Sequence, residues 1–367
     1  MWCAGVLAGA AVLVGPGGAS AQEELPGIEL GLTYASSYLP ALAVQPFMGS
    51  FGGEGIAPQV EAIVGRDMRN SDRFEVLDSL PGAIVGEQVD YGLWDRLGAV
   101  WLVTGQVEGA GDGYVLIVEL HDVVYGEVRE RGRFRLPDQT DEDFRMAVHR
   151  TSDEVVRWAT GDPGMAATRI AFSMLGSDNN KEIYVIDADG ENLHQVTRYG
   201  SMTESATWSP DGSRLALASW KTGVPRIYEI DRFGENERMV PALRGLGDYI
   251  TPTYHPDGET IAFTVMGSDS QSGIFTYNFA QNCCLSFLSG GPWHDYGPTY
   301  SPDGRWLAFA TLRFGTEVPQ VMMMPAEGGS AETLSPYEYG GGGFYSGADW
   351  SPSGDFVAFH GRIDRRG

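Results

Sequence analysis

The sequence has 367 residues, of which 43% are hydrophobic and 20% are charged, so the chain is long enough for two domains with buried cores. Its formal net charge is −24 and no stretch concentrates Lys and Arg, which argues against binding to a nucleic-acid backbone. The acidity indicates either an ordinary solvated surface or an acidic face offered to a basic partner.

The first 21 residues have the pattern of a partial secretory signal peptide. Residues 3–14 are apolar and are followed by Ala19-Ser20-Ala21, a small-residue cleavage site, so Gln22 is the expected mature start. No later segment reaches the roughly 18 apolar residues that a membrane-spanning helix needs. We therefore expect an exported mature chain without membrane insertion.

Residues 22–38 form an extended segment in which apolar side chains alternate with other residues. Such a segment is either a frayed terminus, which we prefer on the sequence alone, or an edge strand that can add to another sheet. The alternating residues are Ile28, Leu30, Leu32 and Tyr34.

Strands and helices alternate over residues 39–163, which predicts an α/β domain. The expected elements are a strand at Ala41–Phe47, a loop at Gly49–Gly55, a helix at Ile56–Asn70, a strand at Phe74–Asp78, a short helix at Tyr91–Leu97, a strand at Val100–Val107, a hairpin through the turn 109–113 to Tyr114–Leu120, and a helix carrying Phe144, Val148, Val155 and Trp158. Thr140 and Asp143 form a plausible capping pair for that last helix, and Gly161 and Pro163 stop it.

A repeated sequence motif occurs throughout residues 168–367. An aromatic residue followed by a Ser-Pro-Asp-Gly-like turn precedes a hydrophobic triplet whose middle residue is always Ala, and the unit recurs about every 46 residues. The aromatic residues are Trp208, Tyr254, Tyr300 and Trp350, and the triplets begin at Ile170, Leu215, Ile261, Leu307 and Val357. Four short antiparallel strands per unit predict the blades of an all-β propeller, with about four to four and a half blades present.

The two ends of this repeat array look incomplete. The first unit lacks its own aromatic-turn strand, and the last stops at Phe359-His360 before its outer strands. Since a propeller closes to avoid exposed edges, we expect the sequence to be a fragment lacking about one and a half units.

Residues with the spacing of a catalytic, cofactor-binding or metal site are not found. The six histidines form no HExxH pair, and Gly343–Gly347 reads GFYSG, which misplaces the serine of a nucleophile elbow. Asp187–Gly190 resembles a calcium loop but favours a plain turn. The adjacent Cys283 and Cys284 rarely have the geometry for a relaxed disulfide, and we interpret them as small strand residues. The sequence therefore predicts a protein that is not an enzyme.

The loops that enter each innermost strand are expected to cluster at one end of the propeller channel. Tyrosine beside acidic residues in these loops suits protein binding, although ordinary loop residues are the simpler alternative. The candidate partner-binding residues are Glu204, Asp248, Tyr249, Thr251, His294, Asp295, Tyr296 and Tyr345.

Several segments together resemble the TolB family of the Tol–Pal system. They include Ala41–Phe47 with the helix that follows, Phe74–Asp78, Val103–Val107 and the Ser152–Val155 helix that leads into Thr168–Ala171. Ser-Pro-Asp-Gly turns also occur in prolyl oligopeptidase-type propellers, so the leading domain carries the resemblance. It covers nearly the whole chain.

The resemblance implies a periplasmic, monomeric scaffold with a six-bladed propeller and no catalytic activity. Its partners would be a Pal-like peptidoglycan-associated lipoprotein, contacted at positions matching Asp248, Thr251 and Tyr296, and a TolA-like inner-membrane protein bound by residues 22–34. Two alternatives stay open: the propeller of an exported prolyl-oligopeptidase-type peptidase, and a propeller that binds sugars or metabolites.

Overall fold

A computed structural model describes residues 39–77, 89–242, 246–267, 271–314, 318–336 and 343–363. The predicted signal peptide, the segment with Ile28, Leu30, Leu32 and Tyr34, and Asp78 lie outside these ranges. Within them, none of the helices combines the length and the apolar character that spanning a membrane requires.

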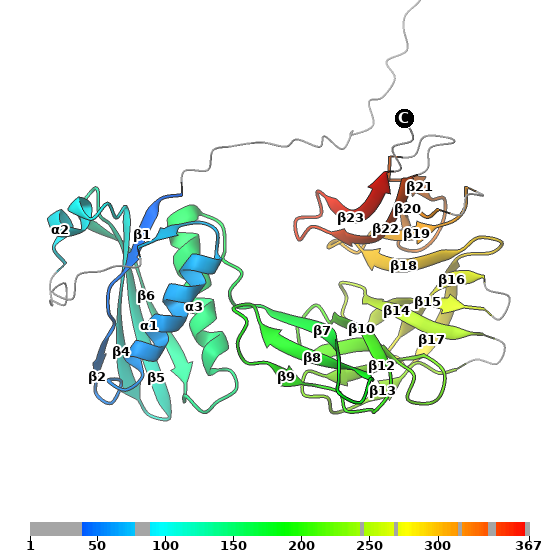
Figure 1. The fold of residues 1–367 in the computed structure, drawn as a ribbon, viewed down its shortest axis with the longest axis horizontal. Coiled ribbons are helices and arrows are strands. Elements are labelled where there is room, and N and C mark those ends of the chain that lie inside the picture. The colour runs from blue at the N-terminus through cyan, green and yellow to red at the C-terminus, as the bar shows by residue number, and fades with distance from the viewer. Residues whose placement is uncertain are drawn as a thin grey trace, which may run out of the picture. The chain divides into compact units, whose positions relative to one another are not determined.

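The α/β part is a six-stranded sheet with helices on it (Figure 1). The strands run in the order β3-β1-β4-β5-β6, and β2 pairs with β4. β1 is parallel to β3 and β4, whereas β4, β5 and β6 form antiparallel hairpins. The elements are β1 (Ala41–Val44), β2 (Met48–Ser50), α1 (Ala57–Asn70), β3 (Glu75–Val76), α2 (Tyr91–Arg96), β4 (Trp101–Ala110), β5 (Gly113–Asp122), β6 (Glu127–Pro137) and α3 (Phe144–Thr160).

The helix spacing of apolar residues explains how α1 and α3 cover the sheet. Val60, Val64 and Met68 recur every fourth residue of α1 and are fully buried. Val148 and Val155 of α3 belong to the same core cluster. The sequence therefore predicted both helices and the faces that they bury.

Three details of this part differ from the prediction. β1 ends at Val44, and residues 45–47 are not in a strand. β2 begins at Met48, overlaps the start of the expected loop and pairs with β4. β6 went unpredicted because its exposed, charge-rich sequence lacks a run of apolar residues. The predicted capping pair of α3 does not form. Asp143 precedes the helix, but its side chain makes no capping hydrogen bond and accepts hydrogen bonds from Arg232 instead. The Thr140 hydroxyl donates to Asp138.

The predicted repeat units are antiparallel sheets arranged in series (Figure 1, green through yellow to red). Three are four-stranded: β10 (Thr203–Trp208), β11 (Arg214–Ser219), β12 (Arg226–Asp231) and β13 (Arg238–Met239); β14 (Asp248–Tyr254), β15 (Thr260–Met266), β16 (Ser272–Asn278) and β17 (Cys283–Ser289); β18 (Asp295–Tyr300), β19 (Trp306–Thr311), β20 (Gln320–Pro325) and β21 (Glu332–Thr333). The outer units are β7 (Arg169–Leu175), β8 (Lys181–Asp187) and β9 (His194–Gln195), and β22 (Gly343–Trp350) with β23 (Val357–Ile363). The propeller-type assignment is confirmed.

The Ser-Pro-Asp-Gly-like motif forms the turn between the first two strands of the four sheets that begin with β10, β14, β18 and β22. In the unit after Trp208, the amide of Gly212 donates to the carbonyl of Ser209 over 2.9 Å, and Gly212 has a φ of +68°, which glycine adopts readily. Asp211 accepts hydrogen bonds from the Ser209 hydroxyl and from Ser213, and these lower the pKa of Asp211 to about 2. The aspartate is thus a local cap for the turn.

The invariant alanines make room for the aromatic residues of the neighbouring sheet. Ala216 belongs to one buried cluster with Tyr254, and Ala262 belongs to the next with Tyr300. Both alanines are fully buried. Small and large side chains alternate between sheets, as predicted for blades packed face to face.

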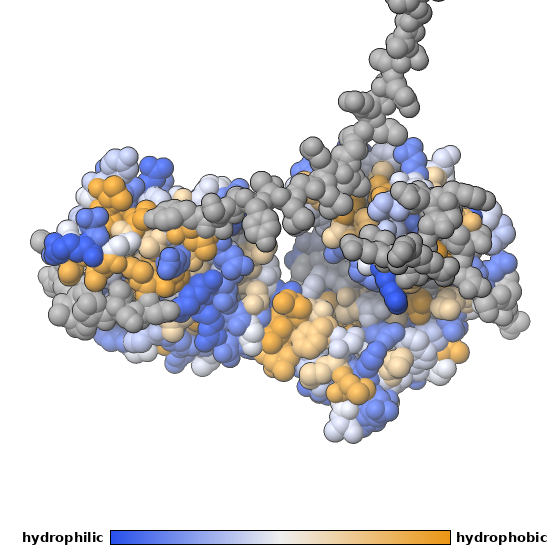
Figure 2. Space-filling model, turned by 45° about the horizontal axis from the view of Figure 1, so that its top comes forward, coloured by the Kyte–Doolittle hydropathy of each residue, from blue (hydrophilic) through white to orange (hydrophobic). Residues whose placement is uncertain are grey.

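The exposed edge of the first unit is apolar. Among the strands that the structure describes, β7 pairs only with β8, and Ile170 and Leu175 are 52% and 59% exposed. Figure 2 shows groups of hydrophobic residues between hydrophilic ones on the face that it draws.

The interpretation of Cys283 and Cys284 as unlinked strand residues is wrong. They form a disulfide at the start of β17, with their Cα atoms 3.7 Å apart. Side chains of successive residues in a regular strand point to opposite faces, which disfavours such a bond. Here Cys284 leaves the regular strand conformation, with a φ of 70°.

Candidate partner-binding face

The first strands of successive sheets, β10, β14, β18 and β22, contact one another in series. Each carries an irregularity at the same point of the repeat, which divides the strand into an entry segment and the segment that leads to the turn. The pairing register shifts between Glu204 and Thr207, between Ile250 and Thr253, between Tyr296 and Thr299, and between Ser346 and Asp349.

The backbone at this point is left-handed in all four strands. Ser205 and Thr251 have φ values of 58° and 48°, and Gly297 and Gly347 have 61° and 64°. For a β-branched residue such as Thr251 this conformation is unfavourable, and strained positions of this kind cluster at functional sites. The entry segments of the four strands are therefore the candidate partner-binding face.

The predicted contact residues lie in these entry segments, but in strands rather than in loops. β10 begins at Thr203, β14 at Asp248 and β18 at Asp295, so only His294 precedes its strand. The bulge interrupts the period-two alternation, and the sequence pattern therefore resembled a loop.

Three of the eight predicted contact residues are buried. Tyr249 and Asp295 have no exposed surface, and Tyr345 is 7% exposed. The ring of Tyr249 lies 5.2 Å from that of Phe263, with the Arg226 guanidinium 4.9 Å from its centroid. These side chains belong to the interior of the sheets and cannot meet a partner in this structure.

Asp295 joins three strands through its carboxylate. It accepts hydrogen bonds of 2.6 Å from Ser289 at the end of β17 and from Thr311 at the end of β19. Arg313 donates through Nη2 over 2.6 Å and through Nε over 3.2 Å. Asp295 is therefore a structural anchor beneath the candidate face.

Five predicted residues remain partly accessible: Glu204, Asp248, Thr251, His294 and Tyr296. Glu204 pairs with Lys181 over 2.9 Å. The hydroxyls of Thr251 and Thr264 lie 2.7 Å apart, and Thr264 Oγ1 also accepts the amide hydrogen of Gly297, so adjacent sheets are tied together here. Partial burial raises the pKa of Tyr296, which keeps the phenol neutral.

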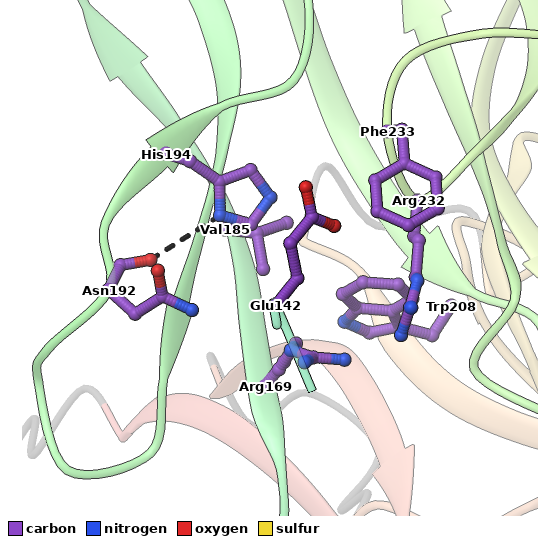
Figure 3. Close-up of a pocket in the computed structure, with 8 residues that line it drawn as sticks. All are labelled: Glu142, Arg169, Val185, Asn192, His194, Trp208, Arg232 and Phe233. Carbon is purple, nitrogen blue, oxygen red and sulfur yellow. Dashed lines mark hydrogen bonds between the residues drawn. The ribbon is translucent and has the colours of Figure 1, made fainter. Parts of the chain in front are cut away.

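A cavity of about 220 Å³, which the sequence did not predict, lies at the turn end of the first sheets (Figure 3). It is lined by Glu142, Arg169, Val185, Asn192, His194, Trp208, Arg232 and Phe233. Arg169 and Arg232 both donate to Asp143, so their charges are already compensated. The lining residues come from six separate segments, which leaves no spacing signal in the sequence.

A serine–histidine pair lies within the GFYSG segment and its neighbour strand. Ser346 Oγ is 2.9 Å from His360 Nε2, across β22 and β23. Within the described ranges, no carboxylate contacts His360 to complete a catalytic triad.

One group of side chains has the composition of a metal site, although the sequence predicted no metal ligands. Ligand atoms of Asp67, His149 and Asp189 lie within 4.8 Å of one another. The three come from α1, α3 and the turn after β8. The turn itself is as predicted, with the Gly190 amide donating to the Asp187 carbonyl over 2.9 Å.

Comparison with known proteins identifies both parts of the chain. The TolB beta propeller domain model matches residues 156–366, and the TolB amino-terminal domain model matches residues 30–128. The Tol-Pal system protein TolB of Albidiferax ferrireducens is 32% identical over 201 residues, which cover 54% of this chain and 46% of that protein.

A second relative and a solved structure give further coverage figures. The TolB of Xanthomonas oryzae pv. oryzae (strain MAFF 311018) is 32% identical over 252 residues, which cover 65% of this chain and 55% of that protein. The crystal structure of TolB from Acinetobacter baumannii superposes with a TM-score of 0.73 at 24% identity, covering 89% of this chain and 78% of that one. The chain spans about half the length of the curated relatives that it matches.

Proposed function

Because this chain belongs to the TolB family, we propose that it is a non-enzymatic periplasmic component of the Tol–Pal system that holds a Pal-like peptidoglycan-associated lipoprotein at the candidate partner-binding face. The observation that carries this proposal is the left-handed bulge repeated in the first strands of four sheets. It occurs at the same point of β10, β14 and β18, and the accessible predicted residues lie in these strands or, for His294, directly before one of them. Family membership favours this scaffold over a peptidase or a metabolite-binding propeller.

The accessible residues have the composition of a small protein–protein interface, with one aromatic ring and charged side chains. Tyr296 offers a partly buried aromatic ring, which is the type of side chain that anchors many interfaces. Asp248 adds negative charge, which suits a partner that presents basic or hydrogen-bond-donating groups, whereas the charge of Glu204 is already paired with Lys181. Tyr249 contributes by shaping the face from below, since it is buried.

The test is a titration of the chain with its Pal-like lipoprotein. The double variant Asp248→Ala with Tyr296→Ala removes one charge and the aromatic anchor, and we expect the dissociation constant to rise roughly 30-fold or more, about 2 kcal/mol. The matched control is Asp112→Ala with Tyr125→Ala, since Tyr125 is 80% exposed on the other part of the chain. Unchanged affinity of the first variant, or equal losses in both, would contradict the proposed site.

We propose a second contact for the extended segment of residues 22–38, with Ile28, Leu30, Leu32 and Tyr34 adding to a TolA-like inner-membrane protein as a strand. The residues lie outside the described ranges, and the proposal rests on their alternating pattern and on family membership. Repeating the titration with a chain that lacks residues 22–34 separates the two partners. We expect loss of TolA-like binding and retention of Pal-like binding, and the reverse result would contradict the assignment.

A further inference from the structure

The disulfide between Cys283 and Cys284 lies at the outer edge of its sheet. It begins β17, which is the last strand in the order β14-β15-β16-β17 and pairs only with β16 among the strands that the structure describes. Cys284 is exposed and Cys283 is partly exposed. A thiol reagent in solution therefore reaches this bond without any opening of the sheet.

The bond is coupled to the backbone conformation of Cys284. Successive side chains of a regular strand point to opposite faces of the sheet, so neighbouring cysteines in a regular strand are directed apart. Cys284 instead has a φ of 70°, in the left-handed region. This conformation is unfavourable for most residues that carry a side chain. The disulfide therefore holds Cys284 in a conformation that a free cysteine seldom adopts.

The left-handed residue is part of an irregularity in the pairing of β16 with β17. Between the pairs Thr276–Ser286 and Asn278–Cys283, β16 contributes one residue and β17 contributes two, one of which is Cys284. An extra residue of this kind is a β-bulge. A bulge on an edge strand hinders the pairing of another strand with that edge. The disulfide thus maintains an edge that is protected against strand addition.

The turn that precedes β17 has features that suit the reduced state. Gln281 Oε1 lies 3.5 Å from Cys283 Sγ and 4.0 Å from Cys284 Sγ, so it is an acceptor within reach of the thiol groups that reduction creates. The turn is also held independently of the disulfide, since the Tyr277 hydroxyl donates to Asn282 Oδ1 over 2.6 Å. We therefore expect reduction to change Cys284 and to leave the turn in place.

We propose that Cys283 and Cys284 form a redox modification site that a dithiol reductant opens, and that reduction moves Cys284 to the extended conformation and removes the bulge from β17. A thiolate of the reductant attacks the more exposed sulfur, that of Cys284, and Cys283 leaves as a thiolate that takes up a proton. The second thiol of the reductant loses its proton and attacks the first sulfur of the reductant, which releases Cys284 to be protonated. The protein gains two electrons and two protons, and the reductant becomes a disulfide.

The consequence is an edge whose shape depends on the thiol state. The oxidised chain presents a bulged β17, whereas the reduced chain presents a regular edge strand with backbone groups free for pairing. This inference does not rest on lipoprotein binding, because the entry segments belong to the first strands of the sheets and β17 is the outermost strand of its sheet.

The experiment is nuclear magnetic resonance of the full chain with isotope-labelled cysteine, using dithiothreitol as the reductant. Without reductant, the Cβ chemical shifts of Cys283 and Cys284 should be those of a disulfide, and the backbone shifts of Cys284 those of a left-handed residue. With dithiothreitol, the Cβ shifts should become those of thiols. The extended form of Cys284 should then exceed the left-handed form about 5- to 30-fold, as the usual cost of the left-handed conformation predicts.

Two controls separate the bond from the turn. Cys283→Ser cannot form the disulfide, so its Cys284 should be extended with or without dithiothreitol. Asn282 is the matched control in the unsubstituted chain, since it has a φ of 51° but lies outside the bond. Asparagine tolerates this conformation, so its backbone shifts should stay left-handed on reduction.

Four results would overturn the proposal. They are free thiols before dithiothreitol is added, a disulfide that resists dithiothreitol in the folded chain, a Cys284 that stays left-handed after reduction or in Cys283→Ser, and a change of Asn282 together with Cys284 on reduction. The last result would mean that the whole turn melts when the bond is opened.

Discussion

Replacing Tyr249 by alanine should lower the free energy of unfolding by about 3–5 kcal/mol, the usual cost of removing a fully buried aromatic ring. The ring packs on Phe263 and lies under the Arg226 guanidinium, so alanine leaves a cavity in a cluster that spans two sheets. The measurement is the shift of the urea midpoint, followed by tryptophan fluorescence.

Two variants serve as controls for the Tyr249 prediction. Tyr249→Phe keeps the ring and removes only the hydroxyl group. It should therefore lower the free energy of unfolding by about 0.5–1.5 kcal/mol, the usual contribution of one hydrogen bond and less than the cost of the alanine variant. Tyr125→Ala removes a ring that is 80% exposed and should cost less than about 0.5 kcal/mol. If Tyr249→Ala were as stable as Tyr125→Ala and instead bound the lipoprotein poorly, Tyr249 would be a contact residue after all.

Asp295→Ala should destabilise the chain by roughly 3 kcal/mol, near the lower end of the range for breaking a buried ion pair. The substitution leaves Arg313 without its carboxylate partner and removes the acceptor of two hydroxyl groups. The lower end applies because the Arg313 side chain keeps 22% exposure and can be partly hydrated.

The matched control for Asp295 is Asp248→Ala, in the corresponding strand of the preceding sheet. Asp248 is partly exposed and forms no ion pair with a residue that the structure describes, so this variant should stay within about 0.5 kcal/mol of the parent. Chemical unfolding of both variants separates the two roles. Equal stability of the two variants would remove the anchoring role assigned to Asp295.

Most of the fold could be predicted because its signals are local or periodic. The recurrence of Trp208, Tyr254 and Tyr300 before a turn indicated where the sheets begin and end. The spacing of Val60, Val64 and Met68 indicated which face of α1 is buried. β6 carried no such signal, since an edge strand with one solvated face tolerates charge at most positions.

The candidate face was predicted in position but not in detail. The repeat identified the entry segments, yet the burial of Tyr249 and Asp295 depends on neighbouring sheets that the local sequence does not specify. The left-handed position occupied by Ser205 and Thr251 carries glycine in the other two sheets, at Gly297 and Gly347, and aligning the four units would have indicated it.

The cluster of Asp67, His149 and Asp189 and the vicinal disulfide had no sequence signature. Asp67, His149 and Asp189 lie far apart along the chain and meet only through tertiary packing, so no ligand spacing exists to detect. The disulfide depends on the backbone conformation of Cys284, which the cysteine pair alone does not determine.

The location of the partner is the central claim, and hydrogen–deuterium exchange of the chain with and without its Pal-like lipoprotein tests it most directly. Bound lipoprotein should slow the exchange of amides at residues 203–205, 249–251 and 294–297, while the sheet formed by β4, β5 and β6 exchanges as before. Protection confined to β4, β5 and β6, with unchanged exchange in the three entry segments, would contradict the account.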